Sequence, residues 1–496
     1  MSLESLKVTE SPEVIARYEA IKKLGQDIFK NGETEEADLV TQKDVYLAEE
    51  FLAKSAKETN PPVWASYWEH VLLAPELGRR VAEEAVSKGI DVNPSNSEFL
   101  LWLHDVGVEV TPRYLRKDFV GDQILIRAGI PREVLDGLSS TYRLMVEAEK
   151  LQLTDSQLRL EEELNVGQKS LVDEYFKSLS PTQRITNLAD NLGKRDENGL
   201  FTLEAFRKYL KTQETRYSKS SPWSTENWSI SSPTEGQPSR RPAGAVLQYF
   251  TVAKTVEWLE EVGVDFNGIC RDLSDYGPRF ITVVRHGELE NPKGIVYNRD
   301  NLMDPNDIIH LSIEGKDQMG QVAKILSSRR FNSIGIFSSP ETRAIESAET
   351  LREILQSATA DIKTLDGLDD SLSPGPYMEG MKMAEFMKLD GNVYDKDRWG
   401  EYGHESPESI ARRTQDTFWS IARSLKAGEN AILVSHGDPI AWLLNSLEGS
   451  KVSPDKLRDM IYPNKGEAVV AVIDPKGNIF TMYSLNGPQL ASAKIY

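Results

Sequence analysis

The segment Phe280–Gly287, FITVVRHG, gives the clearest indication of the fold of the second half of this chain. Its first five residues form a continuous run of apolar and β-branched side chains, which is typical of a strand buried on both faces. Two similar short runs follow, SIGIF at 333–337 and AILV at 431–434. Each run is too short for a helix, so the pattern predicts three buried strands.

Helical stretches separate these strands, over Lys316–Ser328, Thr342–Gln356 and Ser406–Lys426. Strands that alternate with helices indicate an α/β domain with a mainly parallel sheet. In such folds ligands bind beyond the carboxyl ends of the strands. We therefore expect residues 278–496 to form a three-layer α/β domain with its site at that edge of the sheet.

Cationic and imidazole side chains follow the predicted strands. Arg285 and His286 come directly after the first strand, Arg343 follows the second, and His436 follows the third. Arginine stays charged and offers a planar fork of donors that binds phosphate oxygens in pairs. A histidine among such cations can attack phosphorus while its neighbours neutralise the charge of the transferring group.

Four motifs occur in a fixed order: VRHGE at 284–288, LSIEG at 311–315, SSPETRA at 338–344 and VSHG at 434–437. Together they resemble the histidine phosphatase superfamily, which has the phosphoglycerate-mutase-like fold. The resemblance implies that His286 is transiently phosphorylated. It also implies that Arg285, Arg343 and His436 hold the phosphoryl oxygens and that this domain needs no cofactor.

The same family places a general acid between the second arginine and the last histidine, usually a Glu in an L-x-E setting. Here LDD at 368–370 precedes GPYMEG at 375–380. The resemblance therefore implies that Asp370 is the general acid, with Asp369 as the second choice. An asparagine often follows R-H-G in the family, and Asn291 is the matching substrate-binding residue.

The first half of the chain, from Val14 to about Tyr217, has a helical pattern, because apolar residues recur at three- and four-residue intervals. A capping box, SNSE at 95–98, and the pair Ser180-Pro181 both predict helix starts. Another helix is expected over 244–262. We assign residues 1–270 to an all-α domain that contains a Ser/Pro-rich loop at 218–243.

A second constellation lies in this half: His70, His104, Asp105 and Asp190. Imidazole and carboxylate ligands suit divalent Mn, Fe, Co, Ni, Zn or Mg, and such a metal can activate water against a phosphate ester. The order H…HD…D in a helical context resembles the HD-domain metal-dependent phosphohydrolases. The resemblance implies that these four residues bind the metal.

A purely structural alternative stays open for these residues. Pro75 lies just after His70, where it disfavours a continuous helix and would displace the first ligand. In that alternative His104 and Asp105 cap helices, and Asp190 faces solvent.

Composition narrows the class of protein. The length of 496 residues predicts two or more domains, and a hydrophobic fraction of 39% is enough for packed cores. The single cysteine, Cys270, excludes an intrachain disulfide and predicts a cytoplasmic protein. No apolar stretch is long enough to cross a membrane. The net charge of −19 argues against a nucleic-acid polymer as partner, because such binding needs a basic face.

These patterns predict a phosphomonoester hydrolase that acts through a phosphohistidine on His286, fused to a metal-dependent HD phosphohydrolase. The expected substrate is a small phosphorylated metabolite or nucleotide. Two alternatives remain. A phosphomutase would use the same groups but return the phosphoryl group to a second substrate. The HD-like half would alternatively be a non-catalytic module that senses a ligand and regulates the phosphatase.

Overall fold

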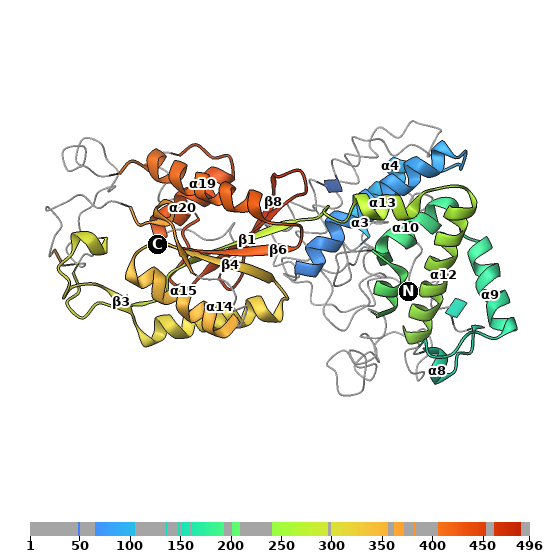
Figure 1. Ribbon diagram of the computed structural model, residues 1–496, viewed down its shortest axis with the longest axis horizontal. Coiled ribbons are helices and arrows are strands. Elements are labelled where there is room, and N and C mark those ends of the chain that lie inside the picture. The colour runs from blue at the N-terminus through green and yellow to red at the C-terminus, as the bar shows by residue number, and fades with distance from the viewer. Residues whose placement is uncertain are drawn as a thin grey trace, which may run out of the picture. The chain divides into compact units, whose positions relative to one another are not determined.

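The chain divides into two compact units, shown in Figure 1. The first comprises Met1–Ser55 and Glu69–Tyr276, and the second comprises Ala56–Trp68 and Gly277–Tyr496. No helix in the described parts combines the length and apolar character needed to cross a membrane. The computed structural model describes residues 48–49, 65–104, 135, 147–148, 150–158, 160–192, 201–208, 241–295, 299–355, 362–371, 381–382, 405–452 and 461–487.

The second unit is built on a six-stranded sheet with the order β5-β4-β6-β1-β7-β8. The first four strands of this order run parallel, and β7 and β8 are antiparallel additions at one edge. The prediction of an α/β domain with a mainly parallel sheet is therefore confirmed. The strands are β1 (Arg279–Arg285), β4 (Asn332–Ser338), β5 (Lys363–Thr364), β6 (Glu429–Ser435), β7 (Ala468–Ile473) and β8 (Ile479–Ser484).

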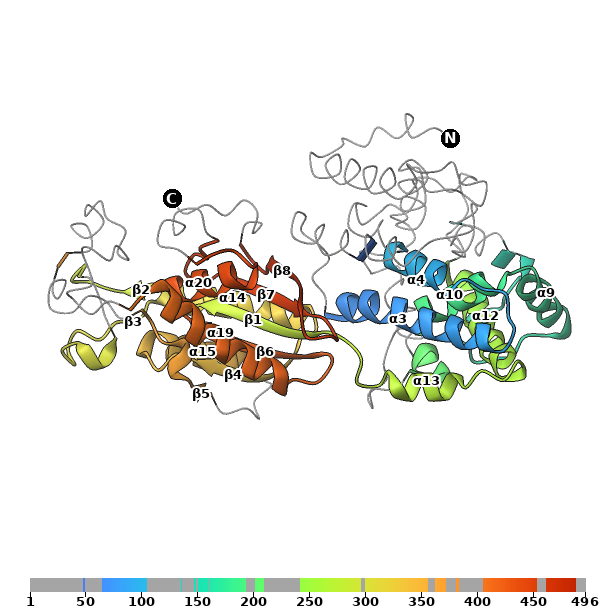
Figure 2. The same cartoon turned by 90° about the horizontal axis from the view of Figure 1, so that it is seen from above.

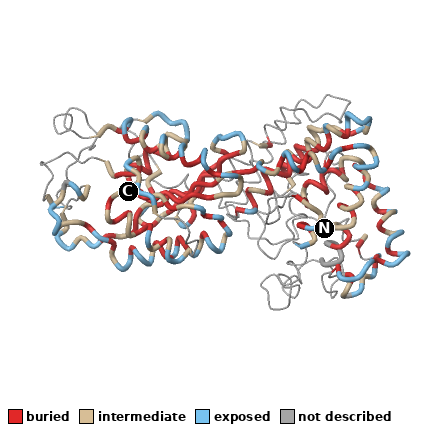
Figure 3. The backbone as a smooth tube through the Cα atoms, in the orientation of Figure 1, coloured by how far each residue is buried: buried red, intermediate tan, exposed pale blue. Residues whose placement is uncertain are grey.

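Helices cover both faces of this sheet: Figure 1 shows α19 and α20 on one side and α14 and α15 on the other. Alternate residues of the strands, such as Ile281 and Val283 of β1, pack against Phe418 of α19 and Leu443 of α20. Figure 3 shows the central strands buried along most of their length. The helices are α14 (Ile313–Ser328), α15 (Thr342–Leu355), α19 (Pro407–Ser424) and α20 (Gly437–Leu447).

The run at 333–337 corrects one expectation. We predicted a strand buried on both faces, but Ile334 is 43% exposed. The reason is its neighbour, because the two-residue strand β5 pairs only with Phe337 and Ser338 and leaves the start of β4 at the sheet edge. The central strands β1 and β6 are buried as predicted.

Short elements beyond the end of β1 complete the second unit (Figure 2). The strands β2 (Leu289–Glu290) and β3 (His310–Leu311) pair with each other, and the 3₁₀ turns η3 (Asp300–Leu302) and η4 (Asp366–Leu368) lie in loops. These loops carry side chains of the candidate site.

The elements described in the first unit are all α-helices. Their shared core contains Leu77, Leu101, Leu188 and Val252, which come from four different helices. The helices are α3 (Ala65–Ser87, which belongs to this unit from Glu69 onward), α4 (Pro94–Leu103), α8 (Asp155–Leu158), α9 (Val166–Lys177), α10 (Pro181–Leu192), α12 (Arg241–Glu261) and α13 (Phe266–Asp272).

Helix starts in this unit follow local capping. The main-chain N–H of Gln183 donates to Ser180 Oγ, and the main-chain N–H of Ser180 donates to Gln183 Oε1. The predicted cap of α10 is therefore confirmed. The capping box predicted at 95–98 is wrong: the N-cap is Asn93, two residues before Ser95, and α4 begins at Pro94. Proline is favoured at the first position of a helix because it has no main-chain N–H that would need an acceptor there. Pro75 lies inside α3, so the expected helix break does not occur.

Candidate active site and candidate metal centre

Neighbouring strand ends bring the two histidines of the second unit together. Arg285, the last residue of β1, pairs with Ser435, the last residue of β6. The main-chain N–H of His286 donates to Ser435 O at 3.0 Å, which places the residues after the two strands side by side. The ring centroids of His286 and His436 consequently lie 5.2 Å apart, and both side chains are buried.

The ring of His286 is held in one tautomer. Its Nδ1 lies 2.9 Å from Gly287 O, and a carbonyl oxygen can only accept, so Nδ1 carries the proton and Nε2 keeps its lone pair. Burial lowers the pKa of His286 well below its usual value, and the charges of His436, Arg343 and Arg285 lower it further. A neutral imidazole with a free Nε2 lone pair is the form that can act as a nucleophile.

His436 stands at the N-cap of α20, directly after β6. Its Nε2 lies 2.8 Å from Ser339 Oγ, and its Nδ1 lies 3.3 Å from Asp370 Oδ2. Burial lowers the pKa of His436 well below its usual value, and the charges of Arg343 and Arg285 act in the same direction. Protonation of either ring of the pair is therefore disfavoured.

Arg343, in the first turn of α15, is fully buried and faces three acidic side chains. Its Nη2 donates to Asp370 Oδ2 at 2.9 Å, and its Nη1 lies 3.3 Å from Glu341 Oε2 and 3.5 Å from Asp300 Oδ1. Burial raises the pKa of Glu341 to about 8 in spite of the nearby arginine. These partners fix the guanidinium and offset part of its desolvation.

Arg285 is the second arginine near the histidine pair. Its Nη1 donates to Pro463 O at 2.9 Å, and its guanidinium lies over the ring of Tyr462. Its buried Nε has no hydrogen-bond acceptor within the described part of the chain. An arginine N–H can only donate, so a bound anion would satisfy it.

Three motif glycines are explained by close backbone packing. A Cβ on Gly287 would collide with the backbone of Gly315, and one on Gly315 would collide with Glu288 O. A Cβ on Gly437 would collide with the hydroxyl of Tyr462. The glycines of R-H-G and L-S-x-x-G thus let the loop after β1 pack against the first turn of α14, and the glycine of S-H-G lets Tyr462 pack against the start of α20.

The two candidate acids point to different partners. Asp370 Oδ2 contacts both Arg343 and His436, as given above, whereas Asp369 Oδ2 lies 3.1 Å from Arg299 Nη1. Asn291 is used in a turn: its amide exchanges two hydrogen bonds with the main chain of Ile295. The structure thus brings Asp370 to the cluster formed by Arg285, His286, Arg343 and His436. No hydrogen bond within the described residues links Asn291 to this cluster.

Several residues near the cluster escaped the sequence reasoning. Ser339 and Glu341 lie inside the quoted motif SSPETRA, so their position next to Arg343 was the available signal. Arg299 and Asp300 lie in a segment without any readable pattern. They reach the site only because η3 packs there: Asp300 N donates to Glu341 Oε2 at 2.6 Å, and Thr342 N donates to Asp300 Oδ2 at 2.6 Å.

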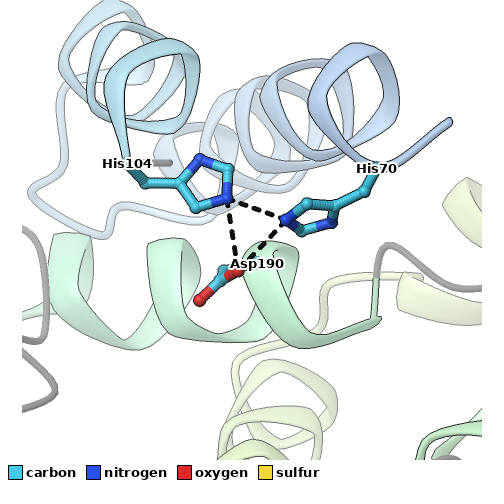
Figure 4. Close-up of side chains that lie close together, drawn as sticks. All are labelled: His70, His104 and Asp190. Carbon is cyan, nitrogen blue, oxygen red and sulfur yellow. Dashed lines mark hydrogen bonds and ion pairs between the residues drawn. The ribbon is translucent and has the colours of Figure 1, made fainter. Parts of the chain in front are cut away.

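In the first unit, three of the four predicted metal ligands converge (Figure 4). His70 Nε2 lies 2.8 Å from His104 Nε2, and Asp190 Oδ1 lies 3.3 Å from each. They come from α3, from the residue after α4 and from α10. Asp105 lies outside the described residues. Asp190, although off the apolar stripe of α10, thus points at the histidines and not simply into solvent.

The donor atoms fit a cation. His104 Nδ1 donates to Leu101 O at 2.5 Å, which turns the other ring nitrogen, Nε2, toward His70 and Asp190. Burial opposes ionisation of Asp190, but the attraction and hydrogen bonds of His104 and His70 outweigh it and hold its pKa well below the usual value. Imidazole lone pairs and a carboxylate at this distance repel one another unless a proton or a metal ion lies between them.

Comparison with known proteins yields a family match. Residues 281–486 match the histidine phosphatase superfamily (branch 1). An uncharacterized Mycobacterium tuberculosis protein, Rv0525, is 30% identical over 186 residues, which are 36% of this chain and 83% of that protein.

Two solved structures resemble the chain as well. The mycobacterial glucosyl-3-phosphoglycerate phosphatase Rv2419c is 19% identical, with a TM-score of 0.32 over 42% of this chain and 97% of that one. A phosphoglycerate mutase from Bacillus anthracis is 16% identical, with a TM-score of 0.32 over 42% of this chain and 92% of that one. Together with the family match and the sheet described above, the motif residues show that the C-terminal part of this chain is a domain of the histidine phosphatase superfamily.

Proposed function

We propose that the C-terminal domain hydrolyses phosphomonoesters through a phosphohistidine on His286. Membership of the superfamily supports phosphatase or phosphomutase activity for this region. The observation that carries the proposal is the fixed tautomer of His286, whose Nε2 lone pair is free while Nδ1–H is bound to Gly287 O. Arg285, Arg343 and His436 surround it with the donors that a phosphoryl group requires.

In the first step, His286 Nε2 forms a bond to phosphorus as the bond to the ester oxygen breaks. Asp370 gives a proton to the leaving oxygen, which departs as an alcohol. In the second step, water attacks phosphorus, the same carboxylate takes a proton from the water, and the phosphorus–nitrogen bond breaks. Inorganic phosphate is released, and His286 returns to its starting form. Asp370 is preferred over Asp369 because it contacts both Arg343 and His436.

A trapping experiment tests this function. The full chain is mixed with a radiolabelled alkyl phosphate and quenched in base, where phosphohistidine survives. We expect an acid-labile label on the peptide that contains His286, with free phosphate as the final product. Absence of this label during turnover would overturn the proposal. Transfer to a second hydroxyl group in place of free phosphate would identify the enzyme as a mutase.

The substrate that we propose is a small phosphorylated metabolite or nucleotide in the cytoplasm. In a protein with a net charge of −19, the positive charge at the site is local, provided by Arg285 and Arg343. A local cationic pocket suits one phosphate group better than a polyanion. A panel of phosphorylated metabolites and nucleotides, assayed with the full chain, would identify the preferred class.

We also propose that the first unit binds a divalent metal, of the Mn, Fe, Co, Ni, Zn or Mg type. The observation that favours it is the convergence of His70 Nε2, His104 Nε2 and Asp190 Oδ1, whose positions all lie within 4.8 Å of one another. Asp105 would be the fourth ligand by the HD-domain resemblance, which remains a prediction. A metal held there would supply Lewis acidity toward a phosphate ester. The hydrogen bond from His104 Nδ1 to Leu101 O would orient that ligand.

Metal analysis of the purified full chain, before and after reconstitution, tests this second proposal. We expect one bound divalent ion, lost in His104→Gln. No metal in either preparation would overturn it. A metal without any hydrolysis by a His286→Asn variant, together with tight nucleotide binding, would support the non-catalytic sensing alternative.

A further inference from the structure

Two arginines outside the predicted site converge on the main chain of the proposed acid. Arg299 and Arg413 both donate to the carbonyl oxygen of Asp370, and Glu405 lies between the two guanidinium groups. We call Arg299, Arg413 and Glu405 the arginine clamp. They come from the loop before η3, from α19 and from the residue before the N-cap of α19.

Arg299 makes the closer approach. Its Nη2 donates to Asp370 O at 2.6 Å and its Nε to the same oxygen at 3.1 Å, a two-pronged hold on one carbonyl. Its Nη1 lies 3.1 Å from Asp369 Oδ2, and its side chain is 18% exposed. A guanidinium can do this because its donors lie in one plane, whereas a lysine ammonium offers no such fork.

Arg413 holds the same segment from the helix side. Its Nη1 donates to Gly367 O at 3.1 Å and to Asp369 O at 2.7 Å, and its Nη2 to Asp370 O at 3.1 Å. Glu405 accepts from Arg413 Nε at 2.8 Å. Burial opposes ionisation of Glu405, but Arg413 outweighs it and lowers the pKa, so Glu405 is ionised.

The clamp fixes the position of Asp370 without leaving a large net charge behind it. Two arginines are matched by the carboxylates of Glu405 and Asp369, both of which are largely buried. The carboxylate of Asp370 points away from the clamp, toward Arg343 Nη2 and His436 Nδ1. A backbone held by several charge-assisted hydrogen bonds leaves the side chain little freedom to move away from the reacting group.

We propose that Arg299 is a positioning residue that aims Asp370 at the leaving oxygen, and that the enzyme acts on esters whose leaving oxygen needs a proton, the alkyl phosphates. This inference rests on the proposed function of the domain. It makes a distinctive prediction, because an alkoxide must be protonated as it departs whereas a dinitrophenolate need not be. Loss of the hold on Asp370 should therefore slow only the first class of ester.

The test compares β-glycerol phosphate with 2,4-dinitrophenyl phosphate in the full chain. The quantity measured is kcat/KM, which reports steps up to release of the alcohol or phenol and omits hydrolysis of the phosphohistidine. For Arg299→Ala we expect a loss of about 100-fold with the alkyl ester and little change with the aryl ester. Arg299→Lys should behave alike, since it keeps the charge but loses the fork.

Controls separate this role from folding and from the function itself. Lys293→Gln, which removes an exposed ion pair with Asp307 near the same loop, should leave both esters unaffected. Added guanidinium should restore part of the alkyl activity of Arg299→Ala. In Asp370→Asn the same change at Arg299 should cost nothing more.

Equal losses with both esters, or no loss with the alkyl ester, would overturn the positioning role. Absence of labelling of His286 in the unmodified chain would instead overturn the proposed function. Retained aryl activity in Arg299→Ala shows by itself that the variant is folded.

Discussion

Each unit of this chain contains a pair of histidines packed edge to face, and the two pairs differ in the side chains that surround them. The ring centroids are 4.9 Å apart for His70 and His104 and 5.2 Å apart for His286 and His436. The first pair faces the carboxylate of Asp190. The second also has one carboxylate, Asp370, 3.3 Å from His436 Nδ1, but it lies near the guanidinium groups of Arg285 and Arg343 as well, of which Arg343 is fully buried.

The side chains around an imidazole pair determine which kind of ligand the pair suits. Around His70 and His104, lone pairs and negative charge accumulate, and a cation relieves the repulsion. Around His286 and His436, positive charge and N–H donors accumulate, and a phosphate group relieves them. On our two proposals, the same residue type would bind a cation in one unit and a phosphate group in the other.

The largest effect should come from removing the nucleophile of the second pair. His286→Asn has no lone pair to attack phosphorus, so we expect phosphatase activity to fall by about 1,000-fold or more. Metal content should not change. Steady-state kinetics with an alkyl phosphate and elemental analysis of the same sample check both statements. Substantial remaining activity would show that another group attacks the ester.

A smaller effect is expected from removing the anion of the first pair. Asp190→Asn leaves both imidazoles in place but takes away the negative charge, so divalent metal affinity should fall by about 100-fold. Calorimetric titration measures it, with His310→Gln as a control on an exposed histidine that pairs only with Glu346 among the described contacts. Unchanged metal affinity would show that the charge of Asp190 does not contribute to metal binding.

The sequence was informative wherever local pattern and strand order act together. The runs at 280–284 and 431–434 became the central strands because continuous apolar residues need burial on both faces. The antiparallel strands β7 and β8 were missed, although AVVAVI at 468–473 is fully buried. Such a run near the end of an α/β pattern does not reveal its direction.

The site was predictable where motifs carry the residues. Arg285, His286, Arg343 and His436 meet because parallel strands end at one edge. Arg299 could not be found in this way, since its contact with Asp370 joins residues 71 positions apart across two loops. Contacts of that kind depend on how loops pack, which periodicity does not encode.

Alanine substitutions at two glycines, one in each unit, should differ in their effect on stability. Gly287→Ala pushes a Cβ into the backbone of Gly315, which cannot rotate away, so a loss of about 3 kcal/mol is expected. Gly78→Ala in α3 meets the tip of Leu101, and the gain in helix propensity of up to about 1 kcal/mol offsets part of that cost. Hydrogen exchange of peptides from β1 and α3 measures both. Equal losses would contradict this reading of the motif glycine.

The smallest effect concerns two buried carboxyl groups, one in each unit. Burial raises the pKa of Glu341 to about 8 and that of Glu98 to about 7, from a usual value of 4.5. Between pH 4.5 and the raised pKa, the folded state holds a proton that the unfolded state has released. Stability therefore falls as pH rises, by up to about 1.4 kcal/mol per pH unit for each group.

The pH range over which stability falls ends near the raised pKa of each group, so it ends at a different pH for Glu98 and for Glu341. Of these two groups, Glu341 is the one that still titrates in the folded state between pH 7 and 8, so its unit should continue to lose stability while the contribution of Glu98 has levelled off. Glu341→Gln should flatten this slope in peptides from β4 and α15, and Glu98→Gln should flatten the slope below pH 7 in α4. Hydrogen exchange at several pH values, corrected for the intrinsic rate, gives both slopes. A slope in β4 and α15 that survives Glu341→Gln would show that a different group, in contact with Arg343 or beyond it, holds the proton, because the amide preserves the acceptor for Asp300 N and removes only the titration.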